Sequence, residues 1–534
     1  MDDNIALSIM KIRMLITLLL MSVFFVNSCK KEDDSVVYEN TLEFIDDADH
    51  DSKSSNDGMI VLGNIQNDPY KFENMLQARN QLANERVGLI TPTITATHKY
   101  MRIKPRNEND LDALKADTNL VLWDYPLHYE IVSLGSYYHD PSIADTLPTW
   151  QYFVVPNDYQ IPIIHVRAEL IYNLYFPEEN SSDTFYDELE ERAYQITGNI
   201  LEGENMKADW WTPTAVIKAY DDIVGGYIPL QGVEVTARRF TKFKTGITDA
   251  SGYCAVDGSF KNSVNYSIKW ERGYWDIRNG VIGQAYYNGP YQKSQWVLNI
   301  ARGGKSLMFA TIHRAAHKFY YGSTLGVKRP ILSVGKTKIA YLDRDASWGT
   351  GCCWGTWDLT GIVPNIFIAY PHESTRTEDV FSTTIHELGH QSHLITLGQS
   401  LYVDLDKEIH ESWAAAIEWS LTNHHYNEEL GRQYSHYAYQ NWYPGNLPSG
   451  KTSCYTPIFI DLIDTYNQCL DNEQRPYDVV QGYYMRQIQN SIIPVSRSLQ
   501  SLYTVLDLYR PSGITRDDIR VLMIKYWDQD YARN

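Results

Sequence analysis

The segment TTIHELGHQSHL, residues 383–394, constrains the fold and chemistry of this chain more than any other. His386 and His390 are four residues apart, so on a helix they lie about one turn apart on the same face. Both imidazoles can then meet one cation, while Glu387 points toward the place where a bound water would lie. Chance gives about 0.02 matches to this pattern in a chain of this composition. The segment therefore predicts a divalent metal site on a helix.

The pattern around these histidines predicts one long helix over residues 374–398. We expect a capping box between Thr375 and Glu378 at its start and a stop at Gly398. A short strand over residues 364–371, PNIFIAYP, precedes it. Helices over residues 306–321 and from Asp404 or Asp406 onward make the remainder of this part mostly helical.

A third ligand is needed to complete a catalytic metal site. The metzincin pattern requires glycine and histidine where this chain has His393 and Thr396, so that class is excluded. The downstream helix offers Glu411 and Glu418, which are seven residues apart and share a face, with Glu408 as a further alternative. Alanines between Glu411 and Glu418 allow this helix to approach its partner closely. We expect His393 to lie near the metal without binding it.

HELGH, then twenty residues, then ESWAAAIE resembles the gluzincin zinc peptidases, whose aminopeptidase-N branch carries a Glu-x-x-Ala-x-x-x-Glu segment. The resemblance covers about residues 360–470 and implies a Zn2+ ion held by His386, His390 and Glu411. It also implies that Glu387 is the general base and that a tyrosine hydroxyl stabilises the oxyanion. We assign that role to Tyr455, with three alternatives: Tyr437, Tyr439 and Tyr443.

One departure from that family bears on specificity. No Gly-x-Met-Glu-Asn segment, which binds the free amine of the substrate in the aminopeptidases, precedes His386. We therefore expect an endopeptidase rather than an aminopeptidase. The His-Glu-x-Gly-His spacing also resembles the enhancin-like and mucin-targeting peptidases, in which a more distant glutamate follows, so peptides or glycoproteins are the expected substrates. We expect an extended substrate to pair with the edge of the strand over residues 364–371.

The N-terminus predicts a lipid anchor. Lys11 and Arg13 precede an apolar run from Met14 to Val26, and VNSC ends at Cys29. About 13 apolar residues are too few to span a bilayer, which takes roughly 20. Residues 1–29 resemble a bacterial lipoprotein signal, which implies acylation of Cys29 and an outer-membrane protein facing the cell surface or the periplasm. The polar residues 30–66 would form a flexible tether.

The composition patterns divide the remaining chain into three parts. Helices and strands alternate over residues 67–205, which predicts a small α/β domain of unknown role. Short strands separated by Gly, Pro and Asp turns follow over residues 212–300, and GVEVTARR with the TDASGY turn resembles the carboxypeptidase regulatory-like β-sandwich. In GITDASGYCAV we expect a hairpin. With a zincin-like peptidase domain over residues 301–534, the predicted fold is a multidomain α+β protein.

The net charge of the chain and the residue at position 387 narrow the possible functions. The chain has 47 basic and 66 acidic residues, a net charge of −19, which argues against nucleic acid as a partner. A lipid-anchored protein that binds glycans or peptides through a non-catalytic domain is the alternative to a zinc peptidase. An intact Glu387 beside two ligands favours the enzyme, because a helix kept only for shape needs no carboxylate there.

Overall fold

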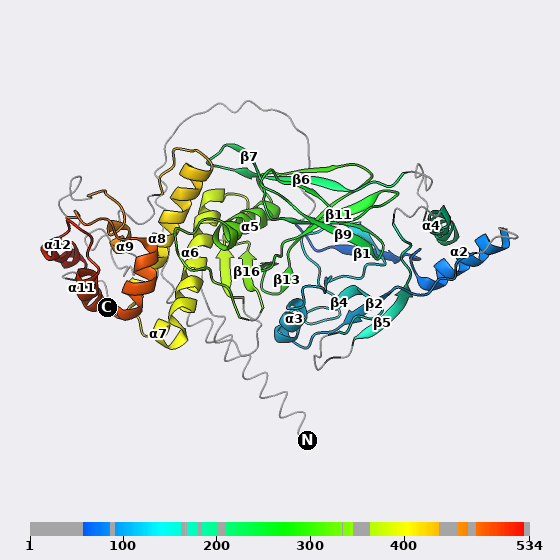
Figure 1. The fold of residues 1–534 in the computed structure, drawn as a ribbon, viewed down its shortest axis with the longest axis horizontal. Helices are drawn as coiled ribbons and strands as arrows, with labels where there is room; N and C mark the ends of the chain where they lie inside the picture. The colour runs from blue at the N-terminus through cyan, green and yellow to red at the C-terminus, as the bar shows by residue number, and fades with distance from the viewer. Residues whose placement is uncertain are drawn as a thin grey trace, which may run out of the picture.

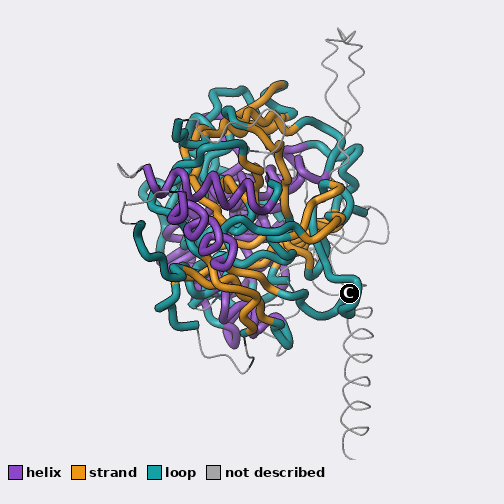
Figure 2. Tube along the Cα trace, turned by 90° about the vertical axis from the view of Figure 1, so that its right-hand side faces the viewer, coloured by secondary structure: helices purple, strands orange, loops and turns teal. Residues whose placement is uncertain are grey.

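The computed structural model describes residues 57–85, 91–161, 166, 168–179, 184–199, 209–333, 335–344, 364–436, 456–467 and 477–527. Helices and strands are both abundant, which confirms a mixed α and β protein. The molecule is elongated, with α2 (Phe72–Glu85) and α4 (Thr184–Thr197) toward one end and α11 (Leu499–Leu508) and α12 (Arg516–Trp527) toward the other (Figure 1). Figure 2 looks along the long axis, so helices and strands from different parts of the chain overlap.

Residues 57–199 contain two small sheets and the helices α2, α3 (Glu108–Lys115) and α4. One antiparallel pair joins β1 (Val61–Ile65) to β3 (Tyr129–Ser133). The other sheet is antiparallel, in the order β4 (Gln151–Pro156), β2 (His98–Ile103), β5 (Glu169–Leu174). Helix α3 begins where the Asn107 side chain accepts the Asp110 N–H, which satisfies one of the unpaired donors of the first turn.

The apolar segment NLVLWDYPLHYEI, residues 119–131, forms a strand only at its end. Only its last residues belong to β3, and Trp123 makes an isolated bridge to Tyr152. Pro126 lacks an N–H to donate to a ladder, and the next N–H, that of Leu127, is bound by the Tyr100 hydroxyl at 2.8 Å. Apolar residues at this position therefore fill the core without forming a strand.

Two four-stranded sheets follow in residues 214–300. One contains β6 (Thr214–Asp221), β7 (Gly226–Pro229), β10 (Tyr253–Ala255) and β15 (Trp296–Ile300); the other contains β8 (Glu234–Arg239), β9 (Lys242–Ile247), β11 (Val264–Lys269) and β14 (Tyr286–Gln292). Alternate residues of β6 are buried, as a strand with one face on a core requires. Buried side chains of both sheets belong to one hydrophobic core.

The hairpin expected in GITDASGYCAV is wrong in its pairing. The turn is present, because Gly252 donates to the Asp249 carbonyl at 2.9 Å. However, β10 pairs with β6 in one sheet, whereas β9 pairs with β8 in the other. The turn is therefore a corner at which the chain changes sheets, and local turn residues do not specify which strand lies beyond it.

A third four-stranded sheet, called the third sheet below, carries the helical part of the chain. Its order is β13 (Gly283–Gln284), β12 (Trp275–Asn279), β16 (Thr337–Leu342), β17 (Ile366–Ala369), and the last three strands are parallel. Because β12 and β13 come before residue 300, this sheet crosses the predicted boundary between the second and third parts. Helix α5 (Lys305–Tyr321) packs against α6 (Thr377–Leu397), which carries the two histidines.

Short helices complete the C-terminal part. Gly398, with φ of 76°, ends α6, as the sequence predicts. The remaining helical segments are α7 (Gln399–Val403), α8 (Lys407–His424), the π-helix η3 (His425–Glu429), α9 (Ile458–Asp461), α10 (Met485–Gln487), the π-helix η6 (Ile488–Ile492), the 3-10 helix η7 (Ile493–Val495), α11 and α12. Within the described ranges, none of the helices is both long and apolar enough to cross a membrane.

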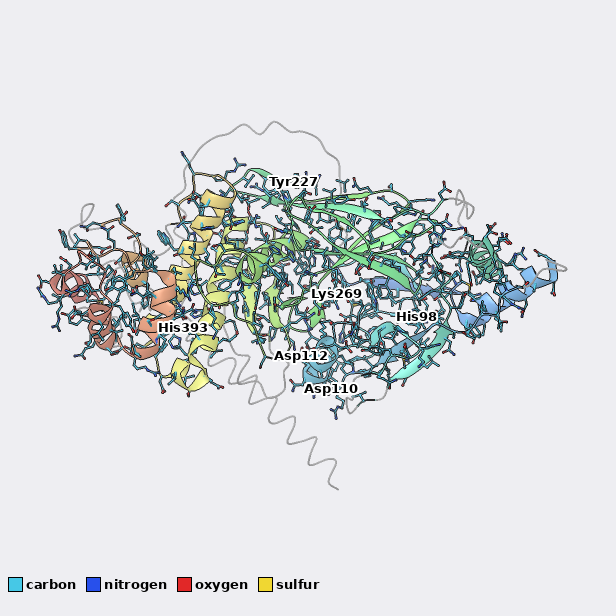
Figure 3. The ribbon with its side chains drawn as sticks, in the orientation of Figure 1. His98, Asp110, Asp112, Tyr227, Lys269 and His393 are labelled. Carbon is cyan, nitrogen blue, oxygen red and sulfur yellow. The ribbon has the colours of Figure 1, made fainter. Side chains whose placement is uncertain are left out.

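Buried ion pairs join the N-terminal part to the third sheet. Lys115 Nζ of α3 lies 2.6 Å from Asp276 Oδ2 of β12, and Lys338 Nζ of β16 lies 3.0 Å from Glu108 Oε2 of α3. All four side chains are buried. Asp112 and Lys269 mark this junction in the middle of the molecule (Figure 3). The two parts are thus held by charged groups that separation would leave unpaired.

The end of β6 contacts the start of α6, the helix that carries His386 and His390. The expected capping box is wrong, because the Thr375 hydroxyl donates to the Pro371 carbonyl and Glu378 pairs with Arg376. Instead, the carboxylate of Asp222 accepts the Thr377 N–H at 2.8 Å. Nearby, Asp221 is fully buried and lies 2.5 Å from Arg314 of α5. A distant carboxylate thus replaces the local cap.

Asp221→Asn should destabilise the fold strongly. It would leave the buried Arg314 guanidinium unpaired, which should cost about 3–5 kcal/mol of unfolding free energy. Burial acts to raise the pKa of Asp221, but Arg314 outweighs it and holds that pKa below its ordinary value. The stabilisation is therefore present above about pH 4 and is lost as the pH falls further, since the carboxyl titrates near 3.9 when unfolded.

Chemical unfolding at several pH values measures this effect. The difference between wild type and Asp221→Asn should be largest at neutral pH and should shrink below about pH 4. Asp257→Asn, at an exposed position of the same part of the chain, is the control and should be close to neutral. An Asp221→Asn variant as stable as the control would show that the ion pair does not hold the fold together.

Candidate metal centre

Helices α6 and α8 approach each other closely at the two histidines. The contact is made possible by small residues: a Cβ on Gly389 would lie 3.3 Å from Ile417 Cδ1, and Ala414 and Ala415 are both buried on α8. This close approach brings Glu411 of α8 to His386 and His390 of α6. The spacing of small residues in both helices thus builds the site.

Three ligand atoms converge between these helices. His390 Nε2 lies 3.1 Å from His386 Nε2 and 3.2 Å from Glu411 Oε2, and His386 Nε2 lies 3.4 Å from the same oxygen. Nitrogen and oxygen ligands about 2.0–2.1 Å from a tetrahedral zinc ion are roughly 3.3–3.4 Å apart, so the triangle has the right size for one ion. Across the described part of the chain, this is the only group of three or more such side chains close enough to share a metal.

The far side of each imidazole is fixed by a neighbouring side chain. His386 Nδ1 lies 3.0 Å from Glu418 Oε2, and His390 Nδ1 lies 3.2 Å from the Tyr402 hydroxyl. Partners of this kind set the ring orientation and the tautomer of metal-binding histidines. In both rings Nδ1 is engaged, which turns Nε2 toward the shared position.

The electrostatics of the group favour a cation. Burial acts to lower the pKa of His386, but the Glu411 and Glu418 carboxylates outweigh it and raise the pKa to about 10. Burial likewise acts to raise the pKa of Glu411, yet the two histidines hold it well below its usual range. The carboxylates thus stabilise a positive charge at His386, whereas burial, together with the neighbouring His386, lowers the pKa of His390. A proton and a metal ion would compete for the same place.

Glu387 lies beside this group. It is only 2% exposed, and its carboxylate acts electrostatically on His386 and on Tyr402. It does not belong to the group of ligand atoms. A buried carboxylate next to a three-ligand site can take up and return a proton there.

The structure also places the alternative residues. Glu418 is fully buried behind His386 and is not among the grouped ligands, and Glu408 lies in the first turn of α8, outside the group as well. His393 is fully buried between Tyr402 and His410, and its ring nitrogens have no hydrogen-bond partner among the described residues. Burial lowers its pKa well below the ordinary value, which keeps the ring neutral.

Several predicted residues fall outside the described ranges. They are Cys29, Tyr437, Tyr439, Tyr443 and Tyr455. Their assigned roles stay predictions.

Sequence reasoning missed two parts of the site. Tyr402 reaches His390 from α7, just beyond the glycine that ends α6. On the other side, His436 Nε2 lies 3.0 Å from Glu418 Oε1, and His436 Nδ1 lies 2.9 Å from the Tyr434 hydroxyl. His436 follows the end of α8 by more than a turn, and no spacing rule connects it to His386. A chain of contacts therefore runs from His386 through Glu418 and His436 to Tyr434.

Removing one of the contacts between His386, Glu418 and His436 should weaken metal binding without abolishing it. Glu418→Gln should lower zinc affinity roughly 10- to 100-fold, the usual effect of losing a carboxylate partner of a metal-binding histidine. His436→Ala should have a smaller effect in the same direction, because it removes only the contact behind Glu418. Competition with a chromophoric chelator measures both. Unchanged affinity in Glu418→Gln would contradict the assigned role.

Comparison with known proteins assigns no family. No protein-family model matches the chain, and neither a curated protein nor a solved structure is significantly similar to it.

Proposed function

We propose that this chain is a zinc-dependent peptidase that cleaves peptide bonds within extracellular or periplasmic proteins, including glycoproteins. The observation that carries the proposal is the triangle of His386, His390 and Glu411 ligand atoms, 3.1–3.4 Å apart, with the buried Glu387 beside it. Two histidines and one carboxylate are the ligand set of catalytic rather than structural zinc sites. On this proposal residues 301–534 form a gluzincin-like peptidase domain, preceded by a regulatory-like β-sandwich over residues 212–300.

The chemistry would divide between the metal and the protein. Zinc, when bound, supplies a lowered water pKa and a polarised substrate carbonyl. Glu387 accepts the proton of the attacking water and then donates it to the leaving amine. Glu418 and Tyr402 hold the two imidazoles in place. A tyrosine, for which Tyr455 is our choice, stabilises the oxyanion.

An extended substrate would pair with the edge of strand β17. Among the described residues β17 pairs with β16 alone, and because its four residues are buried, a substrate strand could pair there only once the other edge is uncovered. The Tyr370 hydroxyl at its end lies 2.7 Å from Thr383 Oγ1, one turn before His386 on α6. A substrate strand on this edge would run next to the histidine helix. Because the amine-binding Gly-x-Met-Glu-Asn segment is absent, cleavage is expected inside the substrate chain.

A digest tests the function directly. The protein is incubated with a peptide library and with a mucin-type glycoprotein, and products are read by mass spectrometry. We expect internal cleavage that a chelator stops and added zinc restores. Products only one residue shorter at the N-terminus would point to an aminopeptidase. No cleavage of either substrate by zinc-loaded protein would favour the glycan- or peptide-binding alternative.

The lipid anchor is tested separately. Wild-type protein should fractionate with membranes, because an acylated Cys29 would insert its chains into the bilayer. Cys29→Ala should appear in the soluble fraction or accumulate unprocessed. Cys254→Ala, which removes a buried thiol with no anchor role, is the control. A Cys29→Ala variant that stays with the membrane would show that the chain is not held there by this cysteine.

A further inference from the structure

A cavity of about 220 Å3 lies between the sheet that contains β2 and β4 and the strand β9. Its walls come from β2 and β4, from the segment after β5, and from β9. His98 marks it in Figure 3, in the half of the molecule opposite His393 and the metal centre. The cavity is thus separate from the site proposed for peptide cleavage.

Most of the cavity wall is apolar. Val154, Pro156, Phe176 and Phe243 line it, and the His98 ring lies 4.7 Å from that of Phe176. Ligand pockets are typically lined in this way, by hydrophobic and aromatic side chains with a few polar groups that orient the ligand. Such walls suit a flat or apolar body.

The cavity wall has more positively charged side chains than negatively charged ones. Lys242 and Lys244 occupy alternate positions of β9, and both pair with a single carboxylate oxygen of Glu179, at 3.4 Å and 3.0 Å. The other Glu179 oxygen accepts the Ser259 N–H at 3.1 Å. Two ammonium groups therefore share one carboxylate, which leaves the wall with one uncompensated positive charge.

Lys242 is the more constrained of the two lysines. Its side chain is only 3% exposed, and its ammonium makes no hydrogen bond with any described residue. The rings of Tyr70, Trp210 and Phe260 lie 5.1–5.9 Å from Nζ, which stabilises the charge without accepting its protons. A buried ammonium has three N–H donors, and leaving them unsatisfied is costly. A ligand with a negatively charged hydrogen-bond acceptor would balance the positive charge and would also pair with these N–H donors.

We propose that this cavity binds a small organic anion that carries one carboxylate beside an apolar or ring-shaped body. The carboxylate would lie against Lys242 and Lys244, and the body against Phe176 and the other apolar side chains. The volume is below the roughly 300–1,000 Å3 of typical ligand sites, so it fits one amino acid or one sugar ring rather than an oligomer. This site does not depend on the proposed peptidase activity.

Calorimetry with matched ligand pairs tests the proposal on the full-length chain in detergent. One pair is N-acetylphenylalanine and its amide; the other is glucuronate and methyl glucoside. In at least one pair the acid should bind ten times more tightly than its neutral partner. Preference in the first pair identifies a peptide-type carboxylate, and preference in the second an acidic sugar. Acids that bind no better than the neutral ligands in both pairs would overturn the proposal.

Two variants should change the affinity for the acid in opposite directions, and a third should leave it unchanged. Lys244→Met should weaken binding of the acid at least tenfold, whereas Glu179→Gln should strengthen it, because the competing carboxylate is lost while an oxygen remains for Ser259. Lys293→Met, an exposed lysine outside the cavity, should change nothing. Melting temperatures show whether each variant is folded. A Glu179→Gln variant that is folded and binds the acid more weakly would contradict the proposed charge balance.

Discussion

Glu387→Gln is expected to keep its zinc and to lose hydrolysis by at least roughly 10²- to 10⁴-fold. The amide is nearly the same size as the carboxylate, and residue 387 is not among the grouped ligand atoms, so metal binding should persist. The proton of the attacking water, however, would have no acceptor. The rate of peptide cleavage and the zinc content are to be measured on the same preparation.

A matched variant on the same helix separates loss of the base from general damage. Glu378→Gln also replaces a buried glutamate of α6, two turns before Glu387 and outside the metal group. It should retain activity within a few-fold. Equal cleavage by Glu387→Gln and wild type would refute the proposed base, and loss of zinc from Glu387→Gln would show that residue 387 acts on the metal instead.

Glu411→Gln is expected to weaken zinc binding by more than the roughly 10- to 100-fold that changes around the ligands cause. The substitution removes the one negative charge that lies 3.2–3.4 Å from both imidazoles. His386→Ala should lose the metal as well, without unfolding the two sheets of residues 214–300. Zinc content after dialysis against a weak chelator measures both effects.

The control for Glu411 lies one turn earlier on the same helix. Glu408→Gln removes a buried carboxylate of α8 that is outside the ligand group, so zinc affinity should not change. If Glu408→Gln loses zinc and Glu411→Gln retains it, the third ligand is wrongly assigned.

The local pattern of the sequence predicts the long helices of the site well. Histidines four residues apart, a glycine stop at Gly398 and alanines on the facing helix are all short-range features. Their consequence, that a carboxylate of the facing helix can approach His386 and His390, follows from helix geometry. The choice among three glutamates required the structure, because the sequence does not show how far α8 is rotated or shifted along α6.

The remaining features depend on contacts between distant segments. Asp222 caps α6 from 155 positions earlier in the chain, so the local Thr375 and Glu378 pattern is misleading. Tyr402 contacts His390, and His436 contacts Glu418, through connections that no spacing rule covers. The corner after β9 has the residues of a hairpin turn, yet its two strands join different sheets. Tertiary packing decided each of these cases.

Titration of metal-free protein with Zn2+ tests the central claim most directly. Bound zinc and the rate of peptide cleavage are followed together in wild type, with Glu387→Gln titrated in parallel. We expect wild-type activity to rise in proportion to bound zinc and to stop rising at about one zinc per chain, while Glu387→Gln binds the same zinc and stays inactive. Cleavage by the metal-free wild type, or zinc binding that brings no activity to the wild type, would contradict this expectation.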